Sequence, residues 1–133
     1  MQYVNSEQAP KIPFLSQASV SESGVVYVSG QVGIIPDSTP PRLEETTAEQ
    51  TKRAMGYVQE ALEAAGSSLA HVGIIHILHT AQADYGQINE AYIESLDAAG
   101  VDKDSRPPRT ATGAAFLPLG ASVEIYAIAE LAK

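Results

Sequence analysis

Cysteine and tryptophan are both missing from this chain of 133 residues. Without a thiol, the sequence excludes disulfide bonds, cysteine nucleophiles and cysteine-ligated zinc. No apolar run approaches the roughly 20 residues that a membrane span needs, and residues 1–11 lack the basic and apolar regions of a secretion signal. We therefore expect no membrane partner. The expected location is the cytoplasm, and a mitochondrial location is the alternative.

Basic residues are also scarce. Eight Lys and Arg stand against sixteen Asp and Glu, so the formal net charge is -8, and the only adjacent basic pair is Lys52 and Arg53. Because the phosphate backbone attracts basic surfaces, we do not expect a nucleic-acid partner. A single arginine could still hold a small anion, since such binding depends on the local site and not on the net charge.

We expect residues 1–133 to form one domain. Its strand pattern begins close to the N-terminus. Residues 2–4 predict a short strand. β-Branched and aromatic residues on both sides of a Gly-containing turn predict a hairpin at 16–33. Gly30 and Gly33, near the end of the second hairpin strand, indicate a bulge or a close backbone approach. A loop with three prolines follows.

Two amphipathic helices are expected between residues 47 and 100. The first begins near Thr47, where Thr47 and Gln50 predict a capping box, and ends near Gly66. The second begins after the cap Asp84 and ends near Gly100. The remaining strands are expected at residues 71–81, 109–116 and 122–131. The order β-β-β-α-β-α-β-β predicts an α+β fold with both helices on one face of the sheet.

Arg109 is the first candidate site residue. It follows Pro107 and Pro108, which stiffen its approach, and it leads into a strand of small residues. A guanidinium on such a rigid element can hold a carboxylate through two parallel hydrogen bonds. The alternative is a strand-edge arginine that pairs with one of the sixteen acidic residues, which is common and of little consequence.

Glu124 interrupts an otherwise apolar strand. Strand alternation puts Glu124 and Tyr126 on a mixed face, and Val123 and Ile125 on a uniformly apolar face that should pack under the helices. The mixed face suits either solvent or a subunit contact. A carboxylate there could orient or deprotonate a water molecule, and a merely solvated side chain is the alternative.

The other polar signals are weaker. Ser29 and Gly30 end a strand, where backbone N–H groups become free to meet a ligand, although such a pair is often only a turn. His76 and His79 are three apart in a strand and so point to opposite faces, which prevents them from sharing a metal ion. We therefore expect no metal site.

Six segments, taken in order, resemble the Rid family of reactive intermediate imine deaminases, formerly called the YjgF family. They are NSEQAPK, PFLSQAS, VYVSGQVG, QTKRAMGYVQEALEAAGSSLAHV, INEAYIESL and RPPRTATGAAFLPLGASVEIYAIA. The resemblance implies a chorismate-mutase-like fold that assembles as a homotrimer with sites in the clefts between subunits. It also implies a hydrolytic activity on small imino or enamino acids, which yields 2-keto acids and ammonia without a cofactor.

The same resemblance assigns residues to that site. It implies that Arg109 holds the substrate carboxylate and that Glu124 positions the attacking water. The residues that match substrate-binding positions of the family are Ser29, Gly30, Asn89, Phe14, Leu15 and Ala111.

Two of these positions depart from the family's pattern. Leu15, with Phe14 beside it, stands where the family has a tyrosine, and Ala111 stands where its best-studied branch often has cysteine. The physiological imine therefore stays open. The alternatives are a biosynthetic relative that acts on a different imine, and a trimeric protein that binds small carboxylates without catalysis.

Overall fold

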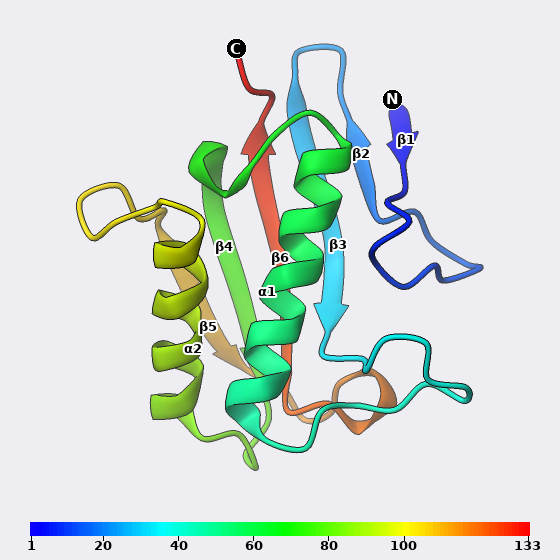
Figure 1. The fold of residues 1–133 in the computed structure, drawn as a ribbon, viewed down its shortest axis with the longest axis vertical. Coiled ribbons are helices and arrows are strands. Elements are labelled where there is room, and N and C mark those ends of the chain that lie inside the picture. The colour runs from blue at the N-terminus through cyan, green and yellow to red at the C-terminus, as the bar shows by residue number, and fades with distance from the viewer.

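A computed structural model describes residues 1–133 as a mixed sheet with two helices (Figure 1). The strands are β1 (Gln2–Val4), β2 (Ala18–Val20), β3 (Val25–Val32), β4 (Val72–His79), β5 (Arg109–Gly113) and β6 (Val123–Glu130). The helices are α1 (Thr47–Ala64) and α2 (Tyr85–Ala98), and the short 3-10 turns are η1 (Leu69–His71) and η2 (Pro118–Gly120). The predicted element order is confirmed.

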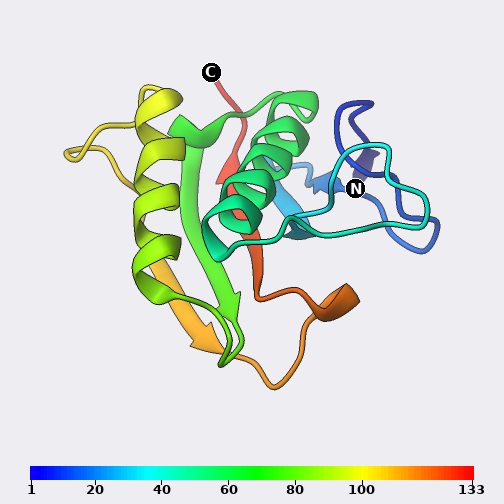
Figure 2. The same cartoon turned by 60° about the horizontal axis from the view of Figure 1, so that its bottom comes forward.

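The six strands are arranged in the order β1-β2-β3-β6-β4-β5. Only β4 and β5 pair in parallel, and every other neighbouring pair is antiparallel. Figures 1 and 2 show both helices on the same side of this sheet, which confirms the predicted α+β class. Neither helix combines the length and the apolar character that a membrane-spanning helix requires.

Strand β6 provides the centre of the core, as its alternation predicts. Its apolar set faces the helices and is at most 2% exposed: Val123, Ile125, Ala127 and Ala129. Helix α1 contributes Met55 and Leu62, and α2 contributes Leu96, all fully buried. Burying one such aliphatic side chain contributes about 1.5–3 kcal/mol. The opposite face of β6, with Glu124, is left without a helix.

The capping box of α1 differs from the prediction by one residue. Thr46 is the N-cap, its hydroxyl accepts from the Glu49 N–H at 3.1 Å, and the Glu49 carboxylate accepts from the Thr46 N–H at 3.2 Å. Thr47 and Gln50 instead turn inward. The Thr47 hydroxyl accepts from the backbone N–H of Asp84, and the Gln50 side chain accepts from the loop before β6. The cap of α2 at Asp84 is confirmed.

The two glycines near the end of β3 have the roles that the sequence indicates. The pairing of β3 with β6 shifts register between Val28 and Gln31, which places a bulge at Ser29 and Gly30. Gly33 lies against α1, because a Cβ added there would come within 2.6 Å of the Gln50 Cα. The bulge and the close backbone approach are both confirmed.

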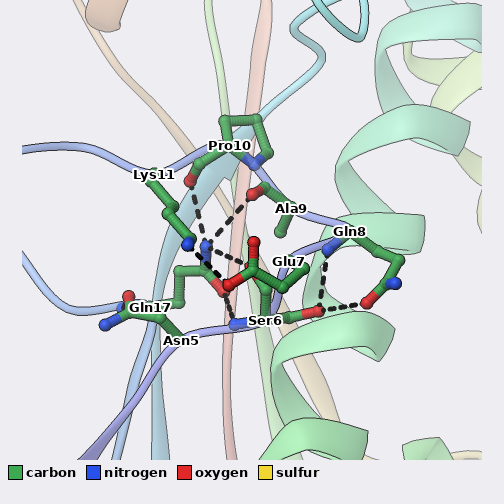
Figure 3. Close-up of polar contacts among 8 residues, drawn as sticks. All are labelled: Asn5, Ser6, Glu7, Gln8, Ala9, Pro10, Lys11 and Gln17. Atoms are coloured by element: carbon green, nitrogen blue, oxygen red, sulfur yellow. Dashed lines mark hydrogen bonds and ion pairs between the residues drawn. The ribbon is translucent and has the colours of Figure 1, made fainter.

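Gln17 ties the N-terminal segment to the sheet, and Figure 3 shows its side chain enclosed by residues 5–11. It is 1% exposed. Its Oε1 accepts from the Ser6 N–H at 2.6 Å, and its Nε2 donates to the carbonyls of Ser6, Ala9 and Pro10 at 3.1–3.2 Å. One buried amide therefore satisfies four backbone groups and fixes the chain just before β2.

We expect Gln17→Ala to lower the free energy of unfolding by about 2–4 kcal/mol, because it leaves a buried Ser6 N–H and several carbonyls unpaired. Denaturant titration of both proteins gives the difference. Gln59→Ala is the matched control, since the Gln59 amide bonds only to Glu63 on the exposed side of α1, and a change within about 0.5 kcal/mol is expected there. Equal losses in the two variants would contradict the role of Gln17.

Candidate active site

Arg109 begins β5 and points toward α2. Its Nη2 donates to the Asn89 Oδ1 at 2.6 Å and to the Tyr85 hydroxyl at 3.0 Å. Its Cζ lies 4.8 Å from the centre of the Tyr92 ring, in a cation–π contact. The ion pairs of the structure involve Lys11, Arg53 and Arg106. The positive charge of Arg109 is therefore held by neutral groups and has no acidic partner.

The residues that hold this guanidinium form one stripe of α2. Tyr85, Asn89 and Tyr92 are spaced i, i+4 and i+7, so they lie on the same side of the helix. Tyr92 is 4% exposed. Burial raises the pKa of its hydroxyl, and the nearby Arg109 and Arg106 oppose this only in part. Tyr92 therefore provides a neutral ring beneath the cation.

Glu124 lies in β6 on the face without helices. It is half-buried and makes no hydrogen bond or ion pair within the chain. Burial raises the pKa of its carboxyl above the ordinary value. Its Oε2 would lie 2.8 Å from a Cβ at Gly30, so any larger residue there would displace the Glu124 side chain. An unpaired carboxyl with a raised pKa is suited to accept a proton from water.

Ser29 and Leu15 lie on the same face, next to the bulge that carries Gly30. The Ser29 hydroxyl donates to the Ser16 carbonyl at 2.6 Å, which fixes the segment that contains Leu15. Leu15 and Ser29 both line a cavity of about 310 Å³. Phe14 does not line this cavity, and its side chain is 85% exposed.

The predicted site residues fall into two groups in one chain. Arg109, Asn89 and the exposed Ala111 lie at the β5 edge, on the helix side. Glu124 lies with the bulge on the opposite face. Strand β4 separates β5 from β6, and Glu124 shares its register with Thr112, three residues beyond Arg109. Adjacent strands are about 4.8 Å apart, so the two groups do not meet within one chain.

A larger hollow of about 580 Å³ contains none of these residues. It lies beside α1, and Glu44, Arg53 and Tyr57 are among its lining residues. Three of its polar groups are already paired, because Arg53 bonds to Glu44 at 2.8 Å and the Tyr57 hydroxyl donates to the Ile34 carbonyl at 2.7 Å. Its larger volume is therefore weaker evidence for a functional site than the unpaired charges of Arg109 and Glu124.

Two residues of the candidate site were not predicted from the sequence. Neither Tyr85 nor Tyr92 was singled out as a candidate site residue. The spacing of both tyrosines around Asn89 was the available signal, because residues at i, i+4 and i+7 share one helix face.

Comparison with known proteins shows which protein family the chain resembles. The family model described as endoribonuclease L-PSP matches residues 6–131. Reactive Intermediate Deaminase A, chloroplastic, of Arabidopsis thaliana is 30% identical over 128 residues, which cover 96% of this chain and 65% of the plant protein. The 2-iminobutanoate/2-iminopropanoate deaminase of Mus musculus is 32% identical over 126 residues, which cover 95% of this chain and 88% of the mouse protein.

Solved structures agree with the sequence comparison. RidA from an Antarctic Psychrobacter superposes with a TM-score of 0.84 at 30% identity and covers 98% of this chain and 100% of its own. E. coli TdcF, solved with bound serine, gives a TM-score of 0.86 at 25% identity and covers 99% and 100%. The fold and the aligned motifs thus define an α+β protein of the L-PSP class. The chain belongs to the Rid, or YjgF, family.

Proposed function

We propose that this protein hydrolyses imines and enamines of amino acids to 2-keto acids and ammonia. One observation carries the proposal: the Arg109 guanidinium is fixed by Asn89, Tyr85 and Tyr92 and has no acidic partner. Its uncompensated charge suits the carboxylate of a small substrate. Relatives named as imine deaminases, and serine bound in TdcF, support this ligand class.

The chemistry follows from the two groups of residues. Arg109 would hold the substrate carboxylate, and Glu124 would accept a proton from the water whose oxygen attacks the C=N carbon. Protonation of the nitrogen then lets the carbon–nitrogen bond break, which leaves a keto group and releases ammonia. Such imines already hydrolyse in water, so positioning and modest proton transfer are sufficient.

A complete site requires more than one copy of the chain, because Arg109 and Glu124 lie on opposite faces. We propose a homotrimer in which the open face of one protomer meets the β5 edge of the next. That open face carries a row of aromatic and aliphatic side chains that no helix covers: Tyr27, Ile74, Tyr126 and Ile128. An uncovered apolar face of this kind is typical of a subunit interface.

We expect light scattering to give three times the chain mass of 14.0 kDa at micromolar concentration. Ile128→Glu should dissociate the assembly and abolish activity while the helical signal in circular dichroism is kept, since it places a charge at the centre of the apolar row. Gln59→Glu, which places the same charge on the exposed side of α1, is the control and should stay assembled. A monomeric wild type with full activity would rule out a site shared between subunits.

The activity itself is tested by generating imino acids in situ with an amino-acid oxidase and following their decay. Wild-type protein should accelerate the decay, and Arg109→Ala should not. Tight binding of 2-keto acids without acceleration would instead establish the non-catalytic binding protein. A panel of imines with different side chains separates a general deaminase from a biosynthetic relative.

Cleavage of RNA is a second candidate, because the matching family model is described as an endoribonuclease. The net charge of -8 opposes it, since a surface of this sign repels the phosphate backbone. Incubation with labelled single-stranded RNA tests it directly, and we expect no cleavage by either wild type or Glu124→Gln.

A further inference from the structure

The Nη2 atom of Arg109 already donates to two protein groups. It donates to Asn89 at 2.6 Å and to Tyr85 at 3.0 Å, and it carries two N–H groups, one for each of these acceptors. A guanidinium has two edges that can each make parallel hydrogen bonds to a carboxylate, Nε with Nη2 and Nη1 with Nη2. Both edges include Nη2.

The two-pronged contact that the sequence predicts is therefore not available from Arg109 alone. The N–H groups without a protein partner belong to Nε and Nη1, which do not share an edge. A carboxylate that approaches the Nη1 side can receive one hydrogen bond from Arg109. Its second oxygen needs another donor beside the guanidinium.

Tyr85 has such a donor in place. Its hydroxyl oxygen accepts from Nη2, and its own proton has no acceptor among the hydrogen bonds of the chain. The residue is 47% exposed, so the hydroxyl is accessible to a ligand. Its ring is supported by His79, at 5.6 Å between ring centres, and lies 5.9 Å from the Arg109 Cζ.

We propose, on the basis of the function proposed above, that Tyr85 supplies the second prong of the carboxylate clamp. The Tyr85 O–H donates to one carboxylate oxygen and the Arg109 Nη1 donates to the other. Asn89 and Tyr92 keep the guanidinium in place while the ligand is bound. Tyr85 is thus a substrate-binding residue for 2-imino and 2-keto monocarboxylates.

Tyr85→Phe tests this assignment, because it removes the hydroxyl and keeps the ring against His79 and Arg109. We expect KM for the imine to rise about tenfold or more, the usual effect of losing a hydrogen bond to a charged group, with kcat within about twofold. The Kd for pyruvate, measured by calorimetry, should rise by the same factor. The Kd for methyl pyruvate, which lacks the charge, should not change. Gln59→Ala removes a polar group on the exposed side of α1, away from the candidate site, and should leave all values unchanged.

Three results would overturn the proposal. Unchanged KM and pyruvate Kd in Tyr85→Phe would show that the hydroxyl does not contact the ligand. Lower values would show that it only competes for Nη2. A loss confined to kcat would make Tyr85 a group of the chemical step. If wild-type protein binds pyruvate but does not accelerate imine decay, the proposed function fails and the pyruvate titration still decides the role of Tyr85.

Discussion

Arg109→Lys is expected to lower kcat/KM for imino acids by about 100-fold or more, although the charge is kept. The lysine ammonium cannot donate to Asn89 and Tyr85, lie flat on Tyr92 and still reach a carboxylate, whereas the planar guanidinium satisfies all of these contacts. Losing one or two charge-assisted hydrogen bonds, at about 1.5–3 kcal/mol each, accounts for a factor of this size.

Steady-state rates with in situ generated imines, over a range of substrate concentrations, give this ratio. Arg42→Lys is the matched control, because the exposed Arg42 side chain makes no hydrogen bond or ion pair. It should behave as wild type. An Arg109→Lys protein within about threefold of wild type would show that a point charge suffices, and it would remove the main support for a preorganised carboxylate site.

The architecture could be predicted because its signals are local. The alternation in β6 and the helical spacing in α1 each depend on neighbours within one turn or one strand, and both patterns hold in the structure. The glycines at the end of β3 likewise predicted the bulge that the structure shows. Such features follow from backbone periodicity, which the sequence expresses directly.

The position of the first capping box could not be decided in the same way. Thr46 and Thr47 are adjacent, and each has a suitable acceptor three residues later, in Glu49 and Gln50. The structure selects Thr46 because Thr47 and Gln50 are needed for contacts with other elements. Two equivalent local patterns are thus separated only by tertiary contacts.

The arrangement of the candidate site also depends on distant parts of the chain. Tyr85, Asn89 and Arg109 meet because β5 pairs in parallel with β4, which brings it alongside α2. The separation of Arg109 from Glu124 has the same origin, since β4 is inserted between β5 and β6. The spacing of residues along the sequence does not show which strands pair or which strand is inserted between two others. The site residues could therefore be predicted, but their grouping in space could not.

Glu124→Gln is expected to reduce kcat by about 100- to 10,000-fold, the range that a positioned general base contributes. The amide keeps the shape of the carboxylate beside Gly30 but is a poor proton acceptor. Because Glu124 lies apart from the carboxylate clamp, the Kd for pyruvate should stay within about twofold of wild type. Glu130→Gln, at the exposed end of the same strand, is the control and should keep full activity.

The stability of the same variant has a definite pH dependence. Burial raises the pKa of Glu124, so the folded protein favours the protonated form. The stability from that protonated carboxyl is complete below the ordinary pKa of 4.5 and is lost as the pH rises through the folded value. Glutamine stays neutral throughout. Relative to wild type, Glu124→Gln should therefore gain in melting temperature between acidic and neutral pH, while Glu130→Gln should not.

Melting curves of the three proteins across that pH range, together with kcat at neutral pH, separate the two roles of the carboxylate. A variant that is slow and yet more stable at neutral pH would show that the unpaired charge is maintained for chemistry at a cost in stability. Wild-type kcat in Glu124→Gln would refute the water-positioning role. A relative loss of stability toward neutral pH would show instead that the ionised carboxylate has a stabilising partner in the assembled protein.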